Sequence, residues 1–434
     1  MSLFAYNSNV PFTAPLVLST GDTVVVGAQG FVYSQSVLFV GQFSLDFLIA
    51  GAVVSWGEAI ILNPTVSNPG SNNILLTSTG LVQGNNAIVS IGPSLDLSNA
   101  GVIKGDSNGL ILTGMASDGA IGSWIVNSGT ISGSSSGISD GASLGFANTT
   151  GGHDGARIDN SGLIAAFAEG TAIRFDDLGI AHDILRNSGL ILGDVRLGGG
   201  NDLYEARGTG EVIGTVYGGA GNDRFRPGFA EETLDGGAGT DVLDFTATSG
   251  IAVALDASFD STGVADGDVY LAMENVLGSR TGADRIMGNS ADNRIVSRGG
   301  NDSLGGGAGN DRLEGGYGSD TLTGGAGNDS FVYLSPTEGR DQVTDFSSAT
   351  VGNNDNFRIL ASGFEGGLVA GALSATRFQS RTDNLAQDAN DRFIFRTTDT
   401  TLWFDKDGTG TAAPVMLADL QSGATMTAAD FLLI

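Results

Sequence analysis

The feature that most restricts the fold of this 434-residue chain is a nine-residue period of glycine and aspartate between Gly299 and Tyr333. Each unit carries glycines just before an aspartate and an apolar residue two positions after it. The aspartates are Asp302, Asp311, Asp320 and Asp329, and the apolar residues are Leu304, Leu313, Leu322 and Phe331. Flexible linkers do not keep an apolar residue at every ninth position, so the period predicts ordered structure.

Apolar burial alone does not order such a unit. One buried side chain contributes about 2–3 kcal/mol, several-fold less than the backbone entropy lost by nine residues, many of them glycine. In a solenoid with nine residues per half-turn, Asp302 lies over Asp320 and Asp311 over Asp329, at the strand spacing of about 4.8 Å. Two carboxylates at that distance repel by roughly 3 kcal/mol. The spacing therefore predicts a divalent cation between the rungs.

Calcium suits these units, because it accepts six to eight hard oxygen ligands and glycine turns expose backbone carbonyls. Zinc does not, since the chain has no cysteine and neither histidine lies in the repeats. We expect the aspartates to bind calcium together with the neighbouring glycines, at backbone angles that favour glycine. The expected metal-site residues are Asp202, Asp223, Asp241, Asp284, Asp302, Asp311, Asp320, Asp329, Gly219, Gly221, Gly237, Gly239, Gly300, Gly307, Gly309, Gly316, Gly318, Gly325 and Gly327. Asn293 occupies an aspartate position without the charge, which predicts a weaker site.

With these units, the chain resembles the repeats-in-toxin (RTX) family of secreted bacterial proteins, whose nonapeptides bind calcium. The resemblance implies an all-β fold with calcium-binding parallel β-rolls. It also implies that the protein leaves a Gram-negative cell unfolded through type I secretion machinery and folds outside on binding calcium. The last residues, Asp430 to Ile434, match the family's uncleaved export signal, an acidic residue followed by apolar ones.

Composition sets further limits. The net charge of −28 argues against nucleic acid and anionic membrane partners. Without cysteine there is no disulfide, so calcium can take that stabilising role outside the cell. No lysine or arginine precedes Lys104, which argues against a basic secretory leader. The most apolar stretch, Phe47 to Trp56, is too short to span a bilayer.

A second, longer repeat occupies residues 71–195. A glycine turn recurs at Gly80, Gly101, Gly129, Gly162 and Gly189, at coil-sized spacings of 21 to 33 residues. An aliphatic residue lies four positions before each glycine and another two after it. Asn99, Asn127, Asn160 and Asn187 precede four of the turns, and we expect their amides to stack at one corner. This pattern resembles a right-handed parallel β-helix.

The repeats divide the chain into predicted regions. Residues 1–70 form a β-rich cap or an assembly face, with strands at Thr23–Val26, Val37–Val40 and Ala52–Ser55. The β-helix of 71–195 continues without a linker into calcium-binding β-rolls at 196–245 and 278–334, separated by a β-rich insertion at 246–277. Residues 335–434 form a β-rich cap with the export signal. There, Asp405, Asp407 and Gly408 form either a further calcium loop or a plain polar turn.

Catalytic motifs are sparse. There is no H-E-x-x-H. About one G-x-S-x-G match is expected by chance among 69 glycines, and neither of the two present, at 133–137 and 141–145, lies in a strand-turn-helix context with a partner histidine. One charged cluster spans residues 153–183, and it reads either as an ion-pair face or as the site of a polysaccharide lyase or epimerase. Its members are His153, Asp154, Arg157, Asp159, Arg174, Asp176, Asp177, His182 and Asp183. The sequence favours a calcium-dependent extracellular structural or adhesive protein that self-associates or binds cell-surface polysaccharide, with the enzyme as the alternative.

Overall fold

The structure is a computed structural model that describes residues 3–12, 16–18, 22–34, 39–41, 45–62, 72–91, 95–113, 123–139, 154–167, 170–175, 182–349 and 353–434. It divides into two compact units. Unit 1 comprises Met1–Asp241 with Asp268–Ala272, and unit 2 comprises Val242–Gly267 with Met273–Ile434. Across the described residues the regular structure is β-strand with four short 3-10 helices, so no helix there could cross a membrane.

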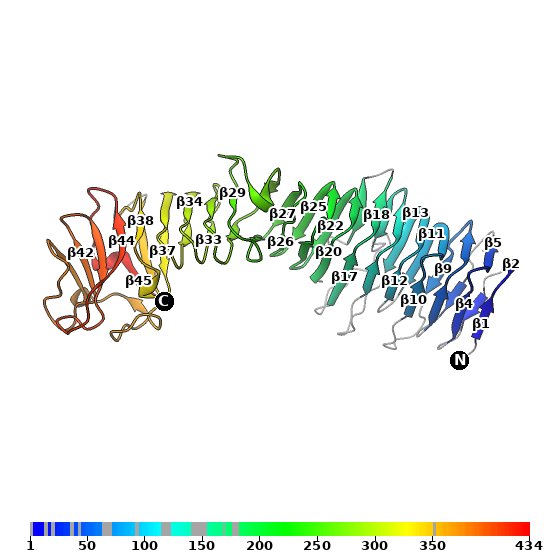
Figure 1. Cartoon of the computed structure of the whole chain (residues 1–434), viewed down its shortest axis with the longest axis horizontal. Coiled ribbons are helices and arrows are strands. Elements are labelled where there is room, and N and C mark those ends of the chain that lie inside the picture. The colour runs from blue at the N-terminus through cyan, green and yellow to red at the C-terminus, as the bar shows by residue number, and fades with distance from the viewer. Residues whose placement is uncertain are drawn as a thin grey trace. The chain divides into compact units, whose positions relative to one another are not determined.

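Unit 1 is a parallel β-solenoid whose coils contribute strands to three sheets (Figure 1). The first sheet holds, in order, β1 (Leu3–Tyr6), β4 (Thr23–Val26), β7 (Asp46–Ile49), β10 (Asn72–Leu76), β12 (Leu95–Asn99), β14 (Trp124–Asn127), β17 (Asp154–Asn160), β20 (His182–Asn187), β23 (Leu203–Ala206) and β26 (Arg224–Arg226). Every pair in this sheet is parallel, which confirms the expected solenoid.

The other two sheets of unit 1 share the long strands β11 (Leu81–Ile91) and β13 (Val102–Thr113). The second sheet also holds β2 (Asn9–Phe12), β5 (Phe31–Ser34), β8 (Ala52–Ser55), β15 (Thr130–Gly133), β18 (Leu163–Ala166), β21 (Leu190–Leu192) and β24 (Glu211–Ile213). The third also holds β3 (Leu16–Leu18), β6 (Phe39–Gly41), β9 (Ile60–Leu62), β16 (Ser136–Ser139), β19 (Thr171–Arg174), β22 (Asp194–Gly199), β25 (Thr215–Ala220), β27 (Thr233–Ala238) and β30 (Val269–Leu271).

The predicted asparagine stack is confirmed at one corner of these coils. The Nδ2 of Asn99 donates to Oδ1 of Asn127 at 2.7 Å, Asn127 to Asn160 at 2.8 Å, and Asn160 to Asn187 at 2.8 Å. All four side chains are buried. A buried amide without such partners costs free energy, so the ladder fixes the register of four coils.

The first coil of the long repeat departs from the predicted register. The sequence aligns Leu76 with Leu97, but the structure pairs Ile74 with Leu97 and places Leu76 opposite Asn99. The turn before Gly80 is longer than the turn before Gly101, while Val82 still pairs with Ile103 as expected. Leu76 is buried like Ile74, so counting back from the glycine finds an inward residue of this coil but not the one that pairs with Leu97.

The N-terminal region forms coils like those that follow it. The expected strands at Thr23–Val26 and Ala52–Ser55 are β4 and β8, whereas the third, at 37–40, is described only from Phe39 as β6. Both β4 and β8 lie in register with later coils. In the described residues, this segment is therefore part of the solenoid stack.

Unit 2 begins as a narrower roll of two parallel sheets. One holds β28 (Val242–Asp244), β31 (Asn275–Leu277), β33 (Arg294–Val296), β35 (Arg312–Glu314), β37 (Ser330–Tyr333), β39 (Asn356–Ile359) and β45 (Phe431–Leu433). The other holds β29 (Ala252–Ala254), β32 (Arg285–Met287), β34 (Ser303–Ala308), β36 (Thr321–Ala326), β38 (Asp341–Val343) and β44 (Val415–Leu420).

The C-terminal part of unit 2 ends the roll as the expected β-rich cap. The antiparallel pairs β44 with β43 (Thr401–Phe404) and β43 with β42 (Phe393–Arg396) replace the parallel pattern, and β41 (Phe378–Arg381) adds to β42. The short β40 (Gly371–Ala372) pairs antiparallel with β45. The 3-10 helices are η1 (Gly263–Ala265), η2 (Pro336–Glu338), η3 (Ala375–Arg377) and η4 (Ala428–Asp430). Phenylalanines replace the single aliphatic residue per rung here, with Phe393 and Phe431 at 4.7 Å between ring centroids.

Candidate calcium sites

The repeat aspartates form hydrogen-bonded ladders at the entrance to each strand. In unit 2, the backbone N–H of Asp302 donates to Oδ1 of Asp320 at 2.8 Å, and that of Asp311 donates to Oδ1 of Asp329 at 2.8 Å. Residues eighteen positions apart are therefore stacked neighbours on the same side of the roll. The structure confirms the stacking that the nine-residue period predicts.

Both units continue these ladders beyond the glycine-rich repeats. In unit 1, the N–H of Asp183 donates to Asp202, Asp202 to Asp223 and Asp223 to Asp241, each at 2.7 Å. In unit 2, Asp320 donates to Asp341 at 2.9 Å and Asp329 to Asp355 at 3.0 Å. Asp341 and Asp355 were missed, and Asp183 was assigned only to the charged cluster, because the G-G-x-G part of the repeat unit is absent before all three. Their common signal is an apolar residue two positions later, at Leu185, Val343 and Phe357.

Several ladder positions leave the second carboxylate oxygen without a hydrogen bond. Among the described residues, such a buried Oδ2 occurs in Asp202, Asp223, Asp302, Asp311, Asp320 and Asp329. These side chains are at most 2% exposed. A buried anionic oxygen without a donor is costly, so the apo arrangement calls for a cation at each Oδ2.

The first glycine of each turn makes room beside that oxygen. A Cβ built on Gly306 would overlap Oδ2 of Asp311 and would lie 2.5 Å from the carbonyl oxygen of Gly324, one turn further on. The same overlap with the Oδ2 of the local aspartate is found at Gly218, Gly236, Gly315 and Gly324. Carboxylate and carbonyl oxygens therefore flank one point that only a residue without a side chain leaves open. The sequence prediction named the later glycines of each turn and missed these.

The later glycines have the backbone conformation that was expected of them. The φ angles of Gly219, Gly221, Gly237, Gly239, Gly300, Gly307, Gly309, Gly316, Gly318, Gly325 and Gly327 all lie between 85° and 148°. At Gly318 and Gly327, an added Cβ would also overlap the backbone of the preceding rung. Close rung stacking and positive φ together require glycine at these positions.

Without a bound metal, burial destabilises the charged form of the ladder carboxylates. Desolvation raises the pKa of Asp311 and of Asp320 to about 7, and that of Asp202 to about 8, despite a backbone N–H donor to each. The charge of Asp329 adds to the rise at Asp311. At neutral pH the ladders therefore need either protons or a cation that supplies the missing positive charge.

These features fit calcium. Among the described residues, no three acidic or histidine side chains meet, and the oxygens found beside the aspartate Oδ2 at Gly218, Gly236 and Gly306 are backbone carbonyls. Hard oxygen ligands in a flexible arrangement are what calcium accepts. The family comparison agrees, because the model of the RTX calcium-binding nonapeptide repeat matches four copies at residues 215–229, 280–313 and 305–333. This chain carries RTX calcium-binding repeats. No curated protein matches its sequence.

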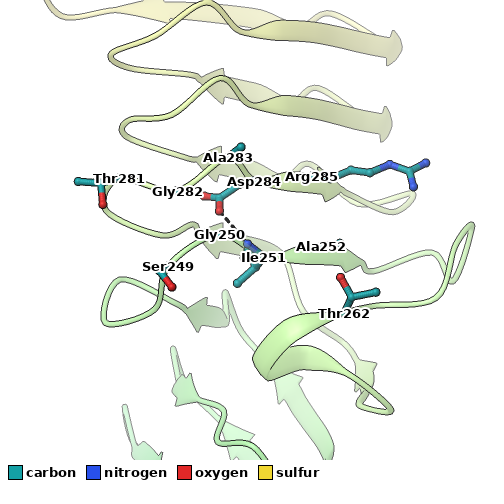
Figure 2. Close-up of a pocket in the computed structure, with 10 residues that line it drawn as sticks. All are labelled: Ser249, Gly250, Ile251, Ala252, Thr262, Thr281, Gly282, Ala283, Asp284 and Arg285. Carbon is teal, nitrogen blue, oxygen red and sulfur yellow. Dashed lines mark hydrogen bonds between the residues drawn. The ribbon is translucent and has the colours of Figure 1, made fainter.

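Two expected ladder positions of this RTX chain differ from the rest. Both oxygens of Asp284 have donors: Oδ2 accepts from the Ser279 N–H at 2.8 Å, and Oδ1 from the Ser279 hydroxyl and the Ile251 N–H. Asp284 and Ile251 line an open pocket of about 630 Å³, and Figure 2 shows the hydrogen bond between them. Asn293 is likewise satisfied, since its Nδ2 donates to Glu274 O at 2.8 Å. A calcium role for Asp284 remains a prediction. Unlike Asp302 and Asp311, it has hydrogen-bond donors to both carboxylate oxygens.

Glu232 lies midway between Asp223 and Asp241, and both of its carboxylate oxygens accept hydrogen bonds from protein groups. Its Oε1 accepts from the Tyr204 hydroxyl and its Oε2 from the Gly228 N–H at 3.0 Å. This rung of the RTX block is filled by a buried tyrosine.

The Asp405 loop in the cap forms the expected polar turn. The alternative, a further calcium loop, stays a prediction. Oδ1 of Asp405 accepts from the N–H groups of Asp407 at 3.1 Å and of Gly408 at 3.0 Å, which makes a polar turn. Oδ1 of Asp407 is buried without a hydrogen bond. No further calcium ligand side chain joins them among the described residues.

The described members of the charged cluster at 153–183 are divided among different sheets and partners. His153, Asp176 and Asp177 lie outside the described residues. Asp183 is buried in the aspartate ladder, and Nδ1 of His182 accepts from the Asn201 N–H at 2.6 Å. Arg174 lies on β19, in the third sheet, away from the β17 strand of the first sheet.

Arg157 and Asp159 do share a face, as expected, with their side chains 3.0 Å apart. The sequence offered no aromatic partner for them, but the structure supplies Trp124 on the neighbouring strand. The Arg157 guanidinium lies 4.9 Å from the Trp124 ring centre, and the indole N–H donates to Asp159 Oδ2 at 3.1 Å.

Proposed function

We propose that this RTX protein is an extracellular structural or adhesive component that is exported unfolded and folds on calcium outside the cell. The single observation that supports the proposal is the series of buried aspartate oxygens without donors, at Asp202, Asp223, Asp302, Asp311, Asp320 and Asp329 among the described residues. A compact roll with these charges unmet is unfavourable in a calcium-poor cytosol, and binding calcium to the folded state alone stabilises it.

Export through a type I machine is the route that the family resemblance implies. Its expected signal, residues 430–434, includes β45, which pairs with β39, and η4, where Asp430 forms a capping box with Thr427. A signal built into a strand of the folded cap would be readable only in the unfolded chain. That order of events agrees with folding after export.

Self-association is the proposed structural activity. Strands β1, β2 and β3 of the first coil each pair on one side, with β4, β5 and β6, and no other strand of the described residues pairs with them. Free strand edges can add another copy of the chain. The outer face of the first sheet adds apolar surface at Leu48, Leu75 and Val126, which are each more than a third exposed.

The test is calcium titration of the full chain, followed by circular dichroism and by sedimentation. In excess chelator, the β-sheet signal of the repeats should fall, and it should return at roughly 0.1–1 mM calcium, the range of extracellular modules. Sedimentable filaments or sheets should form only with calcium. A calcium-loaded protein that stays monomeric at high concentration would contradict the assembly role while leaving calcium-dependent folding intact.

A polysaccharide-modifying enzyme is the second candidate, favoured by Trp124 beside Arg157 and Asp159. An exposed aromatic ring next to a cation and a carboxylate can hold a carboxylated sugar. Against it, Asp159 is engaged by Arg157 at 3.0 Å and by Arg186 at 3.7 Å. Incubation with uronate polymers should yield unsaturated or epimerised products that Arg157→Ala abolishes. An unchanged polymer would leave only the structural role.

A further inference from the structure

Three arginines gather on the outer face of unit 2, in a chain whose net charge is −28. Arg294 on β33 pairs in register with Arg312 on β35, and Arg312 with Ser330 on β37. Arg358 on β39 pairs with Val332, two residues after Ser330 and therefore on the same face of the sheet. Ser330, which is only 9% exposed, lies between Arg312 and the strand that carries Arg358.

Two of these arginines form no ion pair, although Glu314 lies near Arg312. Arg294 lies 3.7 Å from Glu314, and its side chain is 46% exposed. Arg312 and Arg358 are only partly exposed, and neither makes an ion pair or a side-chain hydrogen bond within the described part of the chain. The Nε–H of each is buried without an acceptor.

The surroundings do not compensate for these charges. Burial lowers the pKa of Arg312, and the nearby charges of Arg294 and Arg358 lower it further, against the opposing effect of Glu314. Glu338, close to Glu314, uses its carboxylate to accept from the N–H groups of Leu334 and Ser335. A half-buried guanidinium without an ion pair is costly, so two of them on one face, two rungs apart, indicate an anion that is not part of this chain.

We propose that Arg312 and Arg358, with Arg294 at the rim, bind a phosphate monoester group carried on a sugar. The two unpaired guanidiniums match the charge of about −1.5 to −2 on such a group, whereas a carboxylate supplies only one. Each arginine offers a planar pair of donors that suits two phosphate oxygens. This inference rests on the proposed extracellular role, for which it names an attachment site on a phosphorylated surface glycan.

The test is isothermal titration calorimetry of the calcium-saturated full chain with glucose 1-phosphate. Methyl phosphate tests whether the phosphate binds without the sugar. Glucuronate tests whether a carboxylate on a sugar suffices, and glucose tests whether the sugar binds without a charge. Arg312→Gln and Arg358→Gln should each weaken binding by about tenfold or more, and Arg312→Lys should restore it only in part. Arg280→Gln, at an exposed arginine of the same unit, is the matched control and should change binding by less than about twofold.

Binding of glucose 1-phosphate that Arg312→Gln removes, with an unchanged calcium-induced circular dichroism signal, supports the site. Equal binding of glucuronate overturns the phosphate assignment, and equal binding of methyl phosphate overturns the sugar. Capture by phosphatidic acid vesicles without glucose 1-phosphate binding would assign the face to a membrane instead. If the protein still folds on calcium but binds neither the small ligands nor the vesicles, this inference is overturned while the proposed function stands.

Discussion

Asp329 uses its two carboxylate oxygens differently: Oδ1 accepts from the backbone N–H of Asp311 at 2.8 Å, and Oδ2 is buried without any donor. One oxygen thus maintains the register of the roll, while the other presents a negative charge to the glycine turn. This division of labour recurs along the ladders of both units. It links fold and metal binding in the same side chain, and it allows the two roles to be separated by substitution.

Asp311→Ala should raise the calcium concentration needed to fold unit 2. The variant loses the Asp311 Oδ2 ligand and leaves Asp329 without its stacked partner carboxylate. We expect the midpoint of the calcium-induced circular dichroism change to rise by about threefold to tenfold. Asp260→Asn, which removes one exposed charge from the same unit, is the control. An unchanged midpoint in Asp311→Ala would argue against the stacked calcium sites.

Gly306→Ala should close one calcium site without requiring an unusual backbone angle. Its added Cβ would overlap Asp311 Oδ2, and the φ of Gly306 is not positive. We expect calorimetry to count fewer bound calcium ions than in the parent protein, together with a lower melting temperature in calcium. Gly299→Ala is the control, because a Cβ there would lie 3.3 Å from its nearest neighbour, the Arg280 carbonyl oxygen. Equal ion counts in both variants would remove Gly306 from the site.

Calcium-free protein should be less stable at neutral pH than in mild acid. The pKa of Asp311 and of Asp320 rises from 3.8 to about 7 on folding, so the folded chain binds more protons than the unfolded chain between those values. Stability then falls as pH rises through this window, and it stays low above about 7. Thermal unfolding in chelator from pH 4.5 to 7.5 measures this slope. Saturating calcium should flatten it, and a rise in stability with pH in chelator would contradict the desolvated ladders.

Asn127→Ala should destabilise unit 1 whether or not calcium is present. Asn127 is fully buried and hydrogen-bonds to both Asn99 and Asn160. Truncation leaves these neighbours unsatisfied, at a cost of about 1–3 kcal/mol in the free energy of unfolding. Denaturant unfolding in saturating calcium measures the change, with Asn73→Ala, an exposed partner of Asp46, as the control. A cost that disappears in calcium would show that the ladder depends on the metal sites.

The sequence by itself determined the solenoid, the stacking of aspartates eighteen residues apart and the choice of calcium. These follow from periodicity, because a fixed spacing of aspartate, glycine and one apolar residue permits only one repeating rung. The asparagine corner was predictable for the same reason. Asp284 was the exception within the pattern, since nothing in its spacing reveals that Ser279 supplies donors to both of its oxygens.

Only the tertiary structure decided which atoms are left without partners and which distant residues share a face. The loop lengths between coils vary, so the sequence could not bring Trp124 beside Arg157 or show that Ile74, and not Leu76, joins Leu97. Nor could it place Arg312 and Arg358 on one face, two rungs apart, with no acidic partner. Periodicity specifies a rung, but the register between rungs is set by packing and by hydrogen bonds that form only when the coils stack.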